Sequence, residues 1–349
     1  MSIMKTLIHL SLTVLALGVP FSVHARTPEE DFTARCTAPG VVKCNGFDNT
    51  SSDIVQKQNL FPDGLGVFRG GLDPDQKASG AGSLRFALPP PPHAGANIAG
   101  SWMGPQSAPA FGRTFSQRST FYLQFRLRLS PEMLTNSWPA SNSYKIINMF
   151  HNGVSYGPIE LTTINRYRTG VLALYSQGGA YALYTDPATG AAKPSARPPV
   201  LLQQGDYNCN YSKQNPSDCF YLVPNEWLTL YYRVSVGTWG QPNSTVQVWI
   251  MREKDTAYKQ IVNIHDYMFN CNSAPCDKSP GKDAGFNNLY ISPYMTRLDP
   301  NAGLPGVTSY MWVDELIIST QPIAPPTPKE VPTSLPLAIP TAPHNLSLN

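Results

Sequence analysis

Apolar and polar side chains alternate along residues 121–129, which read FYLQFRLRL. Phe121 and every second residue after it are apolar, and the residues between them are tyrosine, glutamine and arginine. A period of two places these two sets on opposite faces of a β-strand. Such a strand is typical of an antiparallel sheet with one face in the core and the other facing solvent or ligand.

Similar short runs recur along the chain and are separated by turn-rich segments. They predict strands at 83–88, 120–129, 144–151, 159–164, 171–176, 181–185, 227–236, 245–251, 258–263, 287–294 and 309–319. The pattern predicts no amphipathic helix, and at most one helical turn at 131–134. An all-β domain follows, with a long loop-rich insertion at 186–224.

The first 25 residues have the features of an export signal. Lys5 precedes an apolar run at 7–19, and Val23-His24-Ala25 fits the small-x-small cleavage rule. An uncleaved anchor is the alternative, but neither this run nor any later segment has about 18 uninterrupted apolar residues. We expect a secreted or periplasmic protein with a signal peptide at 1–25 and one domain at 26–320. A proline-rich, disordered tail is predicted at 321–349, where eight prolines occur.

Six cysteines follow the predicted signal and fall into three close pairs. Export permits disulfides, and six cysteines allow 15 connectivities. Proximity favours the pairs Cys36–Cys44, Cys209–Cys219 and Cys271–Cys276. Zinc is a weaker alternative, because no CxxC pair or histidine lies at ligand spacing.

Composition narrows the class of partner. Charged residues make up 14% of the chain, which contains 34 prolines and 26 glycines, as is typical of a loop-rich β protein. The net charge of +3 is too small to indicate nucleic acid but permits an anionic ligand. The arginines on the polar face of residues 121–129 make an anionic polysaccharide the first partner to consider, and we expect a monomer.

In their order, these strands resemble the concanavalin A-like jelly-roll superfamily and, within it, the alginate- and glucuronan-lyase-like polysaccharide lyases. The likeness spans residues 115–320. It rests on FYLQFRLRLSPEML (121–134), SYKIINMF (143–150), NRYRTGVLALYS (165–176), EWLTLYYRVSVGT…STVQVWI (226–250) and NNLYISPYMT…SYMWVDELIIST (287–320). The resemblance implies a sandwich of two antiparallel sheets that cleaves an anionic, uronate-containing polysaccharide.

The chain departs from the family pattern at three places. Only Lys145 remains of a Lys-Leu-Pro-Gly-Leu segment. Arg166 and Arg168 lie slightly later than the family's Ser-x-Arg, and Tyr175 stands without the second tyrosine of a Tyr-x-Tyr pair. This incomplete set favours the alternative of a lectin-like, carbohydrate-binding protein without catalysis.

β-Elimination from a uronate requires a group that neutralises the carboxylate, a base for the C5 proton and an acid for the leaving oxygen. We expect Lys145 to be the base or the neutraliser, Arg166 or Arg168 to neutralise, and Tyr175 to be the general acid/base. His151 is a rival base. No metal is required for this reaction.

Each of these residues also has a purely structural interpretation. Lys145 can be a solvated strand residue, His151 a loop-edge residue and Tyr175 a half-buried core residue. Because Lys145 and His151 are six residues apart, they are expected to share a face of one strand. Asn148 would then face the other way unless a β-bulge intervenes.

The polar face of the first strand and one tryptophan are candidates for binding substrate. That face carries Gln124, Arg126 and Arg128. Trp249 alternates with the apolar residues of its own strand, so it is expected to point away from the core. A solvated outer face is the alternative for the two arginines.

Asp314 has the parity of Tyr310 and Trp312, which indicates a partly buried carboxylate. In the superfamily that the chain resembles, the closing strand often holds a structural Ca²⁺ together with the N-terminal strand. The resemblance therefore implies that Asp314 and Asp48 could hold one, although calcium requires several oxygen ligands. The alternative is an aspartate that caps a turn through hydrogen bonds.

Two other functions are less well supported. A glycoside hydrolase requires two carboxylates that face the sugar. Glu160 stands alone, and Asp314 and Glu315 are adjacent, so they are expected to point to opposite faces. A structural role in the cell envelope is supported only by the proline-rich tail.

Overall fold

The computed structural model describes residues 26–49, 66–89, 96–103, 111–135, 143–151, 159–166, 171–175, 181–185, 192–194, 213, 219–269, 284–298 and 308–328. The predicted signal peptide and residues 329–349 lie outside this part of the chain. Arg168 also lies outside it, as do Cys209, Cys271 and Cys276.

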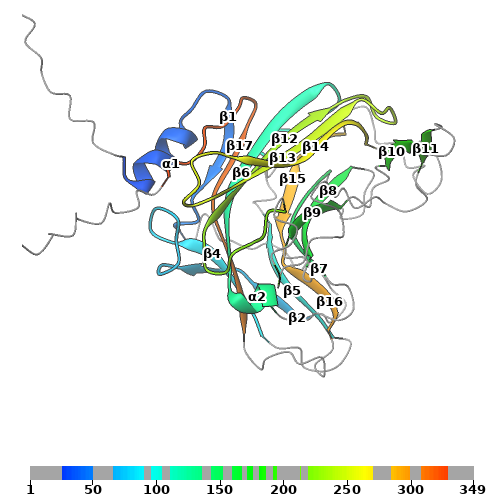
Figure 1. Ribbon diagram of the computed structural model, residues 1–349. Helices are drawn as coiled ribbons and strands as arrows, with labels where there is room; N and C mark the ends of the chain where they lie inside the picture. The colour runs from blue at the N-terminus through cyan, green and yellow to red at the C-terminus, as the bar shows by residue number, and fades with distance from the viewer. Residues whose placement is uncertain are drawn as a thin grey trace, which may run out of the picture.

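Two β-sheets pack face to face and form the predicted jelly-roll sandwich (Figure 1). The ten-stranded sheet has the order β11 (Ala192–Pro194), β10 (Tyr181–Thr185), β14 (Lys259–Met268), β13 (Ser244–Arg252), β12 (Leu228–Val236), β6 (Ser119–Leu129), β17 (Ser309–Ser319), β4 (Ser83–Leu88) and β3 (Gly71–Asp73), and β1 (Val41–Asn45) pairs with β17. The seven-stranded sheet has the order β16 (Tyr294–Leu298), β5 (Ala96–Met103), β15 (Asn288–Ile291), β7 (Ser143–Phe150), β8 (Glu160–Arg166) and β9 (Val171–Tyr175), and β2 (Gly66–Arg69) pairs with β5. Among the described strands, all pairs are antiparallel except β2 with β5.

Every strand expected from the sequence is present in the structure. The strands at 83–88 and 309–319 have the predicted bounds. The strand expected at 287–294 is interrupted at Ser292–Pro293, but its two parts, β15 and β16, pair with β5 in the same register as far as Met295, after which the register shifts. The sequence pattern did not predict β1, β2, β3, β5 or β11.

The core lies between the two sheets and is built from alternate residues of each. Phe121 and Phe125 of the ten-stranded sheet are fully buried, as are Ile147, Met149 and Leu161 of the seven-stranded sheet. Burial of each such side chain contributes about 1.5–3 kcal/mol. The apolar parity of residues 121–129 therefore faces the core, as the sequence predicts.

One polar contact joins the two sheets across this core. The hydroxyl groups of Thr163 on β8 and Tyr232 on β12 lie 2.7 Å apart, and both residues are buried. Burial raises the pKa of Tyr232, so its phenol stays neutral and hydrogen-bonded.

We expect Tyr232→Phe and Thr163→Val each to lower the free energy of unfolding by about 1–3 kcal/mol, because each leaves one buried hydroxyl without its partner. The double variant should lose less than the sum of the two single losses, since no unpaired hydroxyl remains. Urea denaturation of all four proteins measures this coupling. Strictly additive losses would show that the two hydroxyls do not stabilise each other.

Helix α1 (Pro28–Cys36) is the main element that the sequence analysis missed. Thr27 caps it: the side chain of Thr27 accepts from the Glu30 backbone N–H at 3.2 Å, and the Glu30 carboxylate accepts from the Thr27 N–H at 2.8 Å. This capping box, with Pro28 at the first helical position, was the sequence feature that could have revealed the helix. The helical turn expected at 131–134 is confirmed as α2 (Pro131–Thr135).

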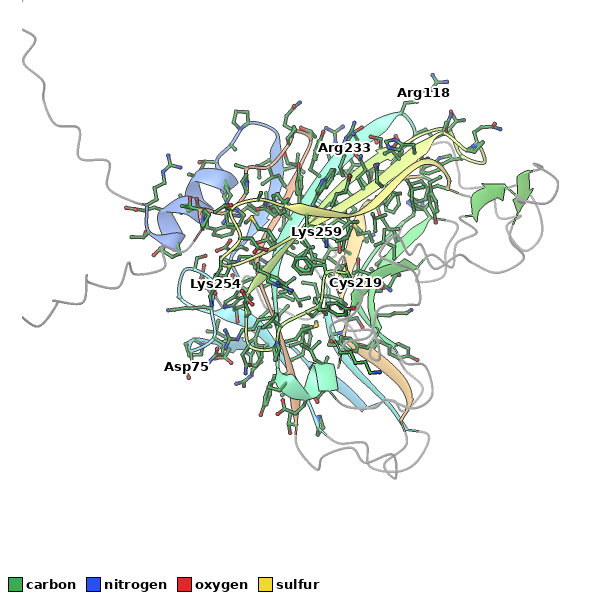
Figure 2. The ribbon with its side chains drawn as sticks, viewed as in Figure 1. Asp75, Arg118, Cys219, Arg233, Lys254 and Lys259 are labelled. Carbon is green, nitrogen blue, oxygen red and sulfur yellow. A yellow bond between two sulfur atoms is a disulfide. The ribbon has the colours of Figure 1, made fainter. Side chains whose placement is uncertain are left out.

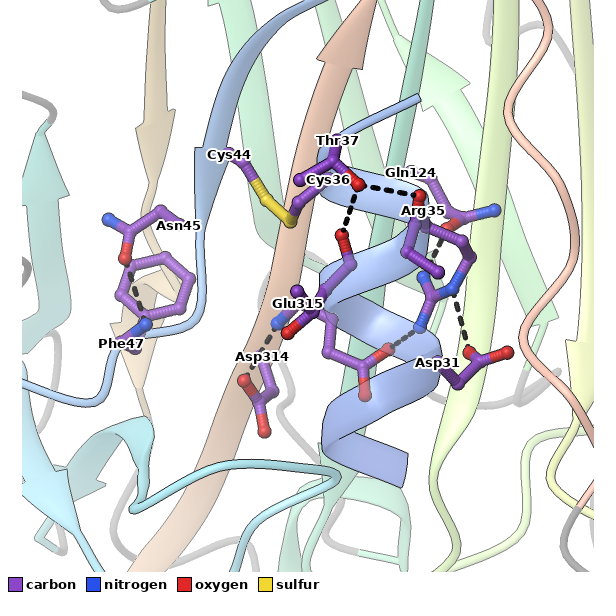
Figure 3. The surroundings of a disulfide bond; sticks show 12 residues. Asp31, Arg35, Cys36, Thr37, Cys44, Asn45, Phe47, Gln124, Asp314 and Glu315 are labelled. Carbon is purple, nitrogen blue, oxygen red and sulfur yellow. Dashed lines mark hydrogen bonds and ion pairs between the residues drawn. A yellow bond between two sulfur atoms is a disulfide. The ribbon is translucent and has the colours of Figure 1, made fainter. Parts of the chain in front are cut away.

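The predicted disulfide between Cys36 and Cys44 is confirmed and joins α1 to β1 (Figure 3). Cys219 is also disulfide-bonded, but its partner lies outside the described residues. The other predicted pairings therefore stay predictions. Among the described residues, no helix is long and apolar enough to span a membrane.

Residues 321–328 belong to the folded domain, although the sequence analysis assigned them to the tail. Ile323 is buried in a small cluster with Phe32 of α1 and Ile317 of β17. The backbone N–H and hydroxyl of Thr327 both donate to Asp31, at 3.3 and 2.5 Å. Apolar contacts and these hydrogen bonds hold the segment in place despite its proline content.

The polar face of the ten-stranded sheet is partly covered, whereas the sequence analysis expected it to meet solvent or ligand. Gln124 is completely buried there and accepts a 2.6 Å hydrogen bond from Arg35 of α1 (Figure 3). Its amide nitrogen donates to the Tyr258 hydroxyl at 3.0 Å and to the Ala324 carbonyl at 2.9 Å. Helix α1 and residues 321–328 therefore enclose much of the polar face of β6.

Candidate active site

A β-bulge in β7 decides which side chains point away from the core. Tyr144 and Lys145 pair with residues 165 and 164 of β8, but the register then shifts, and Ile147 pairs with Thr163. Ile146 is the extra residue in this bulge. Because of it, Lys145 and Asn148 share the outer face of the seven-stranded sheet.

The register brings polar and aromatic residues together on this face. Asn148 pairs with Thr162 of β8 on one side and with Tyr290 of β15 on the other. Tyr294 begins β16, and the Lys145 Nζ lies 5.6 Å from the centre of its ring. This cation–π contact stabilises the charged form of the lysine.

Asn148 is the most unusual residue of the group. Its side chain is only 3% exposed, and its Oδ1 atom has no hydrogen-bond partner. A buried amide oxygen without a partner costs about 1–3 kcal/mol, and native proteins contain few such atoms. Thr162, opposite Asn148, is completely buried. Asn148 and Thr162 are therefore polar residues that are shielded from solvent on the outer face of the sheet.

The break between β15 and β16 supports the bulge. The Ser292 backbone N–H donates to the carbonyl oxygen of Ile146 at 2.8 Å. Pro293 follows and has no N–H to offer a neighbouring strand. On the other side of Asn148, Phe150 and Tyr290 pack with ring centres 4.3 Å apart and form an apolar wall.

Two further predicted residues occupy neighbouring backbone positions. Tyr175 of β9 pairs with Thr162, and Arg166 of β8 pairs with Ser143 of β7. The buried core residues of β9 are Leu172 and Leu174, so the Tyr175 position has the opposite parity. The side chains of Arg166 and Tyr175 lie outside the described part of the structure.

His151 does not share a face with Lys145, contrary to the expectation from their spacing. The bulge shifts the parity, so Phe150 lies on the face of Asn148 and His151 follows with the other parity. The Nδ1 atom of His151 lies 3.0 Å from the carbonyl oxygen of Gly285. The structure therefore separates His151 from the group formed by Lys145 and Asn148.

The four residues expected to bind substrate lie on the other sheet. Gln124 is buried and hydrogen-bonded to Arg35, Tyr258 and Ala324. Arg126 is 7% exposed. The guanidinium of Arg128 lies 5.9 Å from the Trp312 ring, and burial lowers the pKa of Arg128. Trp249 packs against Tyr231, with ring centres 5.5 Å apart. Figure 2 shows the side chains along this sheet, including Arg233 and Lys259.

Asp314 and Asp48 bind backbone N–H groups of one loop. Asp314 accepts from Ala78 at 2.8 Å and Ser79 at 3.3 Å, and Asp48 accepts from Ala81 and, at 3.1 Å, from Gly82. Burial and then the charge of Glu315 raise the pKa of Asp314 well above its usual range.

These carboxylates do not fit a calcium site, because N–H donors are aimed at their oxygens and calcium requires oxygen ligands. Their contacts are those of the alternative interpretation, an aspartate that fixes a turn. The described residues contain no cluster of three or more His, Cys, Asp or Glu that could hold a metal ion.

Asp314 and Glu315 lie on the same side of the ten-stranded sheet, whereas their adjacency predicted opposite faces. The register shifts between Asp314 and Ile317, and Glu315 has a φ of +52°. Asp314 pairs with Arg126, and Glu315 forms ion pairs with Arg126 and with Arg35 of α1 (Figure 3). Both carboxylates contact the protein's own cations and N–H groups, which gives no support for a hydrolytic pair.

Several similar solved structures are polysaccharide lyases. An endo-β-1,4-glucuronan lyase from Trichoderma reesei is 12% identical, with a TM-score of 0.47 over 80% of this chain and 95% of that chain. The alginate lyase from Aplysia kurodai is 11% identical, with a TM-score of 0.43 over 72% and 87%.

Alginate lyase Aly36B is 12% identical, with a TM-score of 0.40 over 79% of this chain and 95% of that chain. No protein-family model and no curated protein matches the chain. We therefore assign the fold from the sheet topology and argue the function from the residues around Lys145.

Proposed function

We propose that the protein is a secreted polysaccharide lyase that cleaves an anionic, uronate-containing glycan by β-elimination. The observation that carries the proposal is the position of Lys145 and Asn148 on one face of β7, where the buried Oδ1 atom of Asn148 has no hydrogen-bond partner. This face combines a cation, an amide and aromatic rings, which suits a charged sugar.

Lys145, Asn148 and Tyr175 can together account for every proton and electron pair that moves in the reaction. The Lys145 ammonium and the Asn148 amide hold the uronate carboxylate and stabilise the negative charge that develops when C5 loses its proton. Tyr175, as phenolate, takes the C5 proton, and the electron pair forms the double bond between C4 and C5. The bond from C4 to the glycosidic oxygen breaks, and that oxygen leaves with a proton from Tyr175.

The contact with Tyr294 favours Lys145 as neutraliser rather than base, because an aromatic face stabilises the ammonium form. Arg166 pairs with Ser143 at the start of β7, which suits a second cation for the carboxylate. The predicted signal peptide and the Cys36–Cys44 disulfide support export, since disulfides persist in oxidising compartments. Alginate and glucuronan are the first substrates to test.

A glycan-binding protein without catalysis is the second candidate. The aromatic residues Phe150, Tyr290 and Tyr294 around Asn148 would serve binding as well as turnover. The two functions differ in their products: a lyase releases unsaturated uronate ends, whereas a binding protein retains intact glycan.

Asn148→Leu tests the proposal. We expect lyase activity to fall by about 10²–10³-fold, the loss usual when one hydrogen-bonding group that stabilises a developing anion is removed. The free energy of unfolding should stay constant or rise, because leucine has the same branched shape as asparagine and removes a buried amide oxygen that has no partner. Activity assays and urea denaturation measure the two effects.

The matched control is Asn263→Leu, an exposed asparagine on β14 of the other sheet. Its activity should equal that of the unaltered protein. Full activity of Asn148→Leu would show that Asn148 is not part of the active site. A large loss of stability would show that Asn148 has a structural role instead.

A further inference from the structure

A cavity lies on the outer side of the ten-stranded sheet, away from Lys145. It has a volume of about 340 Å³. Its lining comes from β6, β17, the turn after β13, α1 with the residues just before it, Ala78 and the segment 326–328. Its charged lining includes Arg126, Glu253 and Glu315. Its walls include Pro28, Ala78 and Pro326.

Arg126 is buried in this cavity without a hydrogen bond. It is 7% exposed, and its nearest anionic atoms are the Oε1 of Glu253 at 3.7 Å and the Oε1 of Glu315 at 3.8 Å. Neither distance is that of a hydrogen bond, and the Nε atom has no partner. A guanidinium carries five N–H donors, and a buried charge normally requires its hydrogen bonds.

Glu315 is held against Arg126 by a strained backbone. Its φ of +52° lies in the left-handed region, which costs a non-glycine residue about 1–3 kcal/mol. Arg35 donates to its Oε2 at 2.5 Å, while its Oε1 has no hydrogen-bond partner and the residue is 1% exposed (Figure 3). Strain of this kind is concentrated at functional sites.

The charges around the cavity balance. The lining carries two cations, Arg26 and Arg126, and three carboxylates, Asp31, Glu253 and Glu315. Arg35 lies behind the lining and supplies the third positive charge through its ion pairs with Asp31 and Glu315. A charged ligand would leave one charge uncompensated, whereas a neutral ligand with hydroxyl groups would not. A hydroxyl can accept from a guanidinium and donate to a carboxylate at the same time.

We propose that this cavity binds a neutral pyranose unit through two vicinal hydroxyl groups. Arg126 donates to both hydroxyls, which donate in turn to Glu253 and Glu315. The proline and alanine side chains contact the apolar face of the sugar ring. The volume is near the lower end of the range for small-ligand sites, about 300–1,000 Å³, and suits one sugar unit.

The test uses the purified full chain and measures binding of D-glucose, D-galactose, D-mannose and D-xylose by ligand-observed NMR titration, with D-glucuronate as the charged comparison. At least one neutral sugar should bind. Glu253→Gln should weaken that binding on the order of tenfold or more, as expected for the loss of a hydrogen bond to a charged group. Glu253 lies in the turn after β13, so this substitution should leave the protein folded.

Two controls separate this site from the candidate active site. Glu132→Gln, in α2, should bind the sugar as the unaltered protein does. Lys145→Ala should also keep the affinity, since Lys145 lies on the other sheet. The proposal is overturned if no neutral sugar binds, if glucuronate binds more tightly than every neutral sugar, or if Glu253→Gln has unchanged affinity. None of these results depends on whether the protein is a lyase.

Discussion

Replacing Lys145 by alanine should reduce β-elimination by about 10²–10³-fold, the loss typical for removal of one group that stabilises a developing anion. Lys145 is half-exposed on the outer face of β7 and contacts the Tyr294 ring. Loss of that contact costs only about 0.5–1 kcal/mol at an exposed site, so the variant should stay folded. Initial rates of ultraviolet absorbance on a uronate polymer, with circular dichroism as the check on folding, measure both effects.

Two other variants show whether the charge or the position of Lys145 matters. Lys145→Arg keeps a cation at this place and should retain more activity than Lys145→Ala. Lys259→Ala removes an exposed lysine of the other sheet and should be fully active (Figure 2). Tyr175→Phe should be as inactive as Lys145→Ala, since it removes the hydroxyl that transfers the proton. Full activity in both Lys145→Ala and Tyr175→Phe would remove these residues from the site.

Replacing Arg35 by methionine should lower the free energy of unfolding by about 3–5 kcal/mol, the cost of leaving a buried ion pair without one partner. Arg35 is 4% exposed and donates to Asp31 at 2.9 Å, Gln124 at 2.6 Å and Glu315 at 2.5 Å. Burial raises the pKa of Asp31, but hydrogen bonds from Thr327 and the charge of Arg35 hold this pKa below its usual value. Removal of Arg35 therefore leaves two buried carboxylates without this cation.

Arg85→Met is the matched control for this loss. The Arg85 side chain is 41% exposed, and its ion pair with Asp73 measures 3.3 Å. An exposed pair contributes about 0–1 kcal/mol, so the control should lose far less stability in the same urea titration. Equal losses for Arg35→Met and Arg85→Met would show that α1 is not anchored by its buried arginine.

Period-two patterning predicted the central strands of the ten-stranded sheet and most strands of the seven-stranded sheet. Residues 121–129 face the core with their apolar parity, and the strands at 83–88 and 309–319 have the predicted bounds. Residues 121–129 alternate strongly, so the core alone selects the orientation of that strand. The Cys36–Cys44 disulfide also followed from proximity in sequence.

The candidate site was harder to predict because two bulges change the parity of single strands. At Ile146 the bulge moves Asn148 to the face of Lys145 and separates His151 from it. At Glu315 a second register shift places that residue on the same side as Asp314. A bulge adds one residue to one strand only, and no local sequence pattern of these apolar runs reveals it. Ser292-Pro293, which faces the first bulge, is the only local hint.

The outer face of the ten-stranded sheet was misjudged for a different reason. Gln124, Arg126 and Arg128 alternate like solvent-facing residues, but α1 and residues 321–328 cover Gln124 and Arg126. Alternation within one strand reveals which side chains point away from the core. It does not reveal which other segments pack against those side chains. The capping box at Thr27 would have revealed the helix, but not the surface on which it packs.

The central claim is tested most directly by incubating the purified protein with alginate, glucuronan, ulvan, pectate and heparinoid and following ultraviolet absorbance. The account predicts a steady rise on at least one of these polymers, from new unsaturated uronate ends, and no such rise with Lys145→Ala. A flat trace on all five, with no new reducing ends, would contradict the lyase and leave a glycan-binding protein. New reducing ends without a rise in absorbance would instead identify hydrolysis.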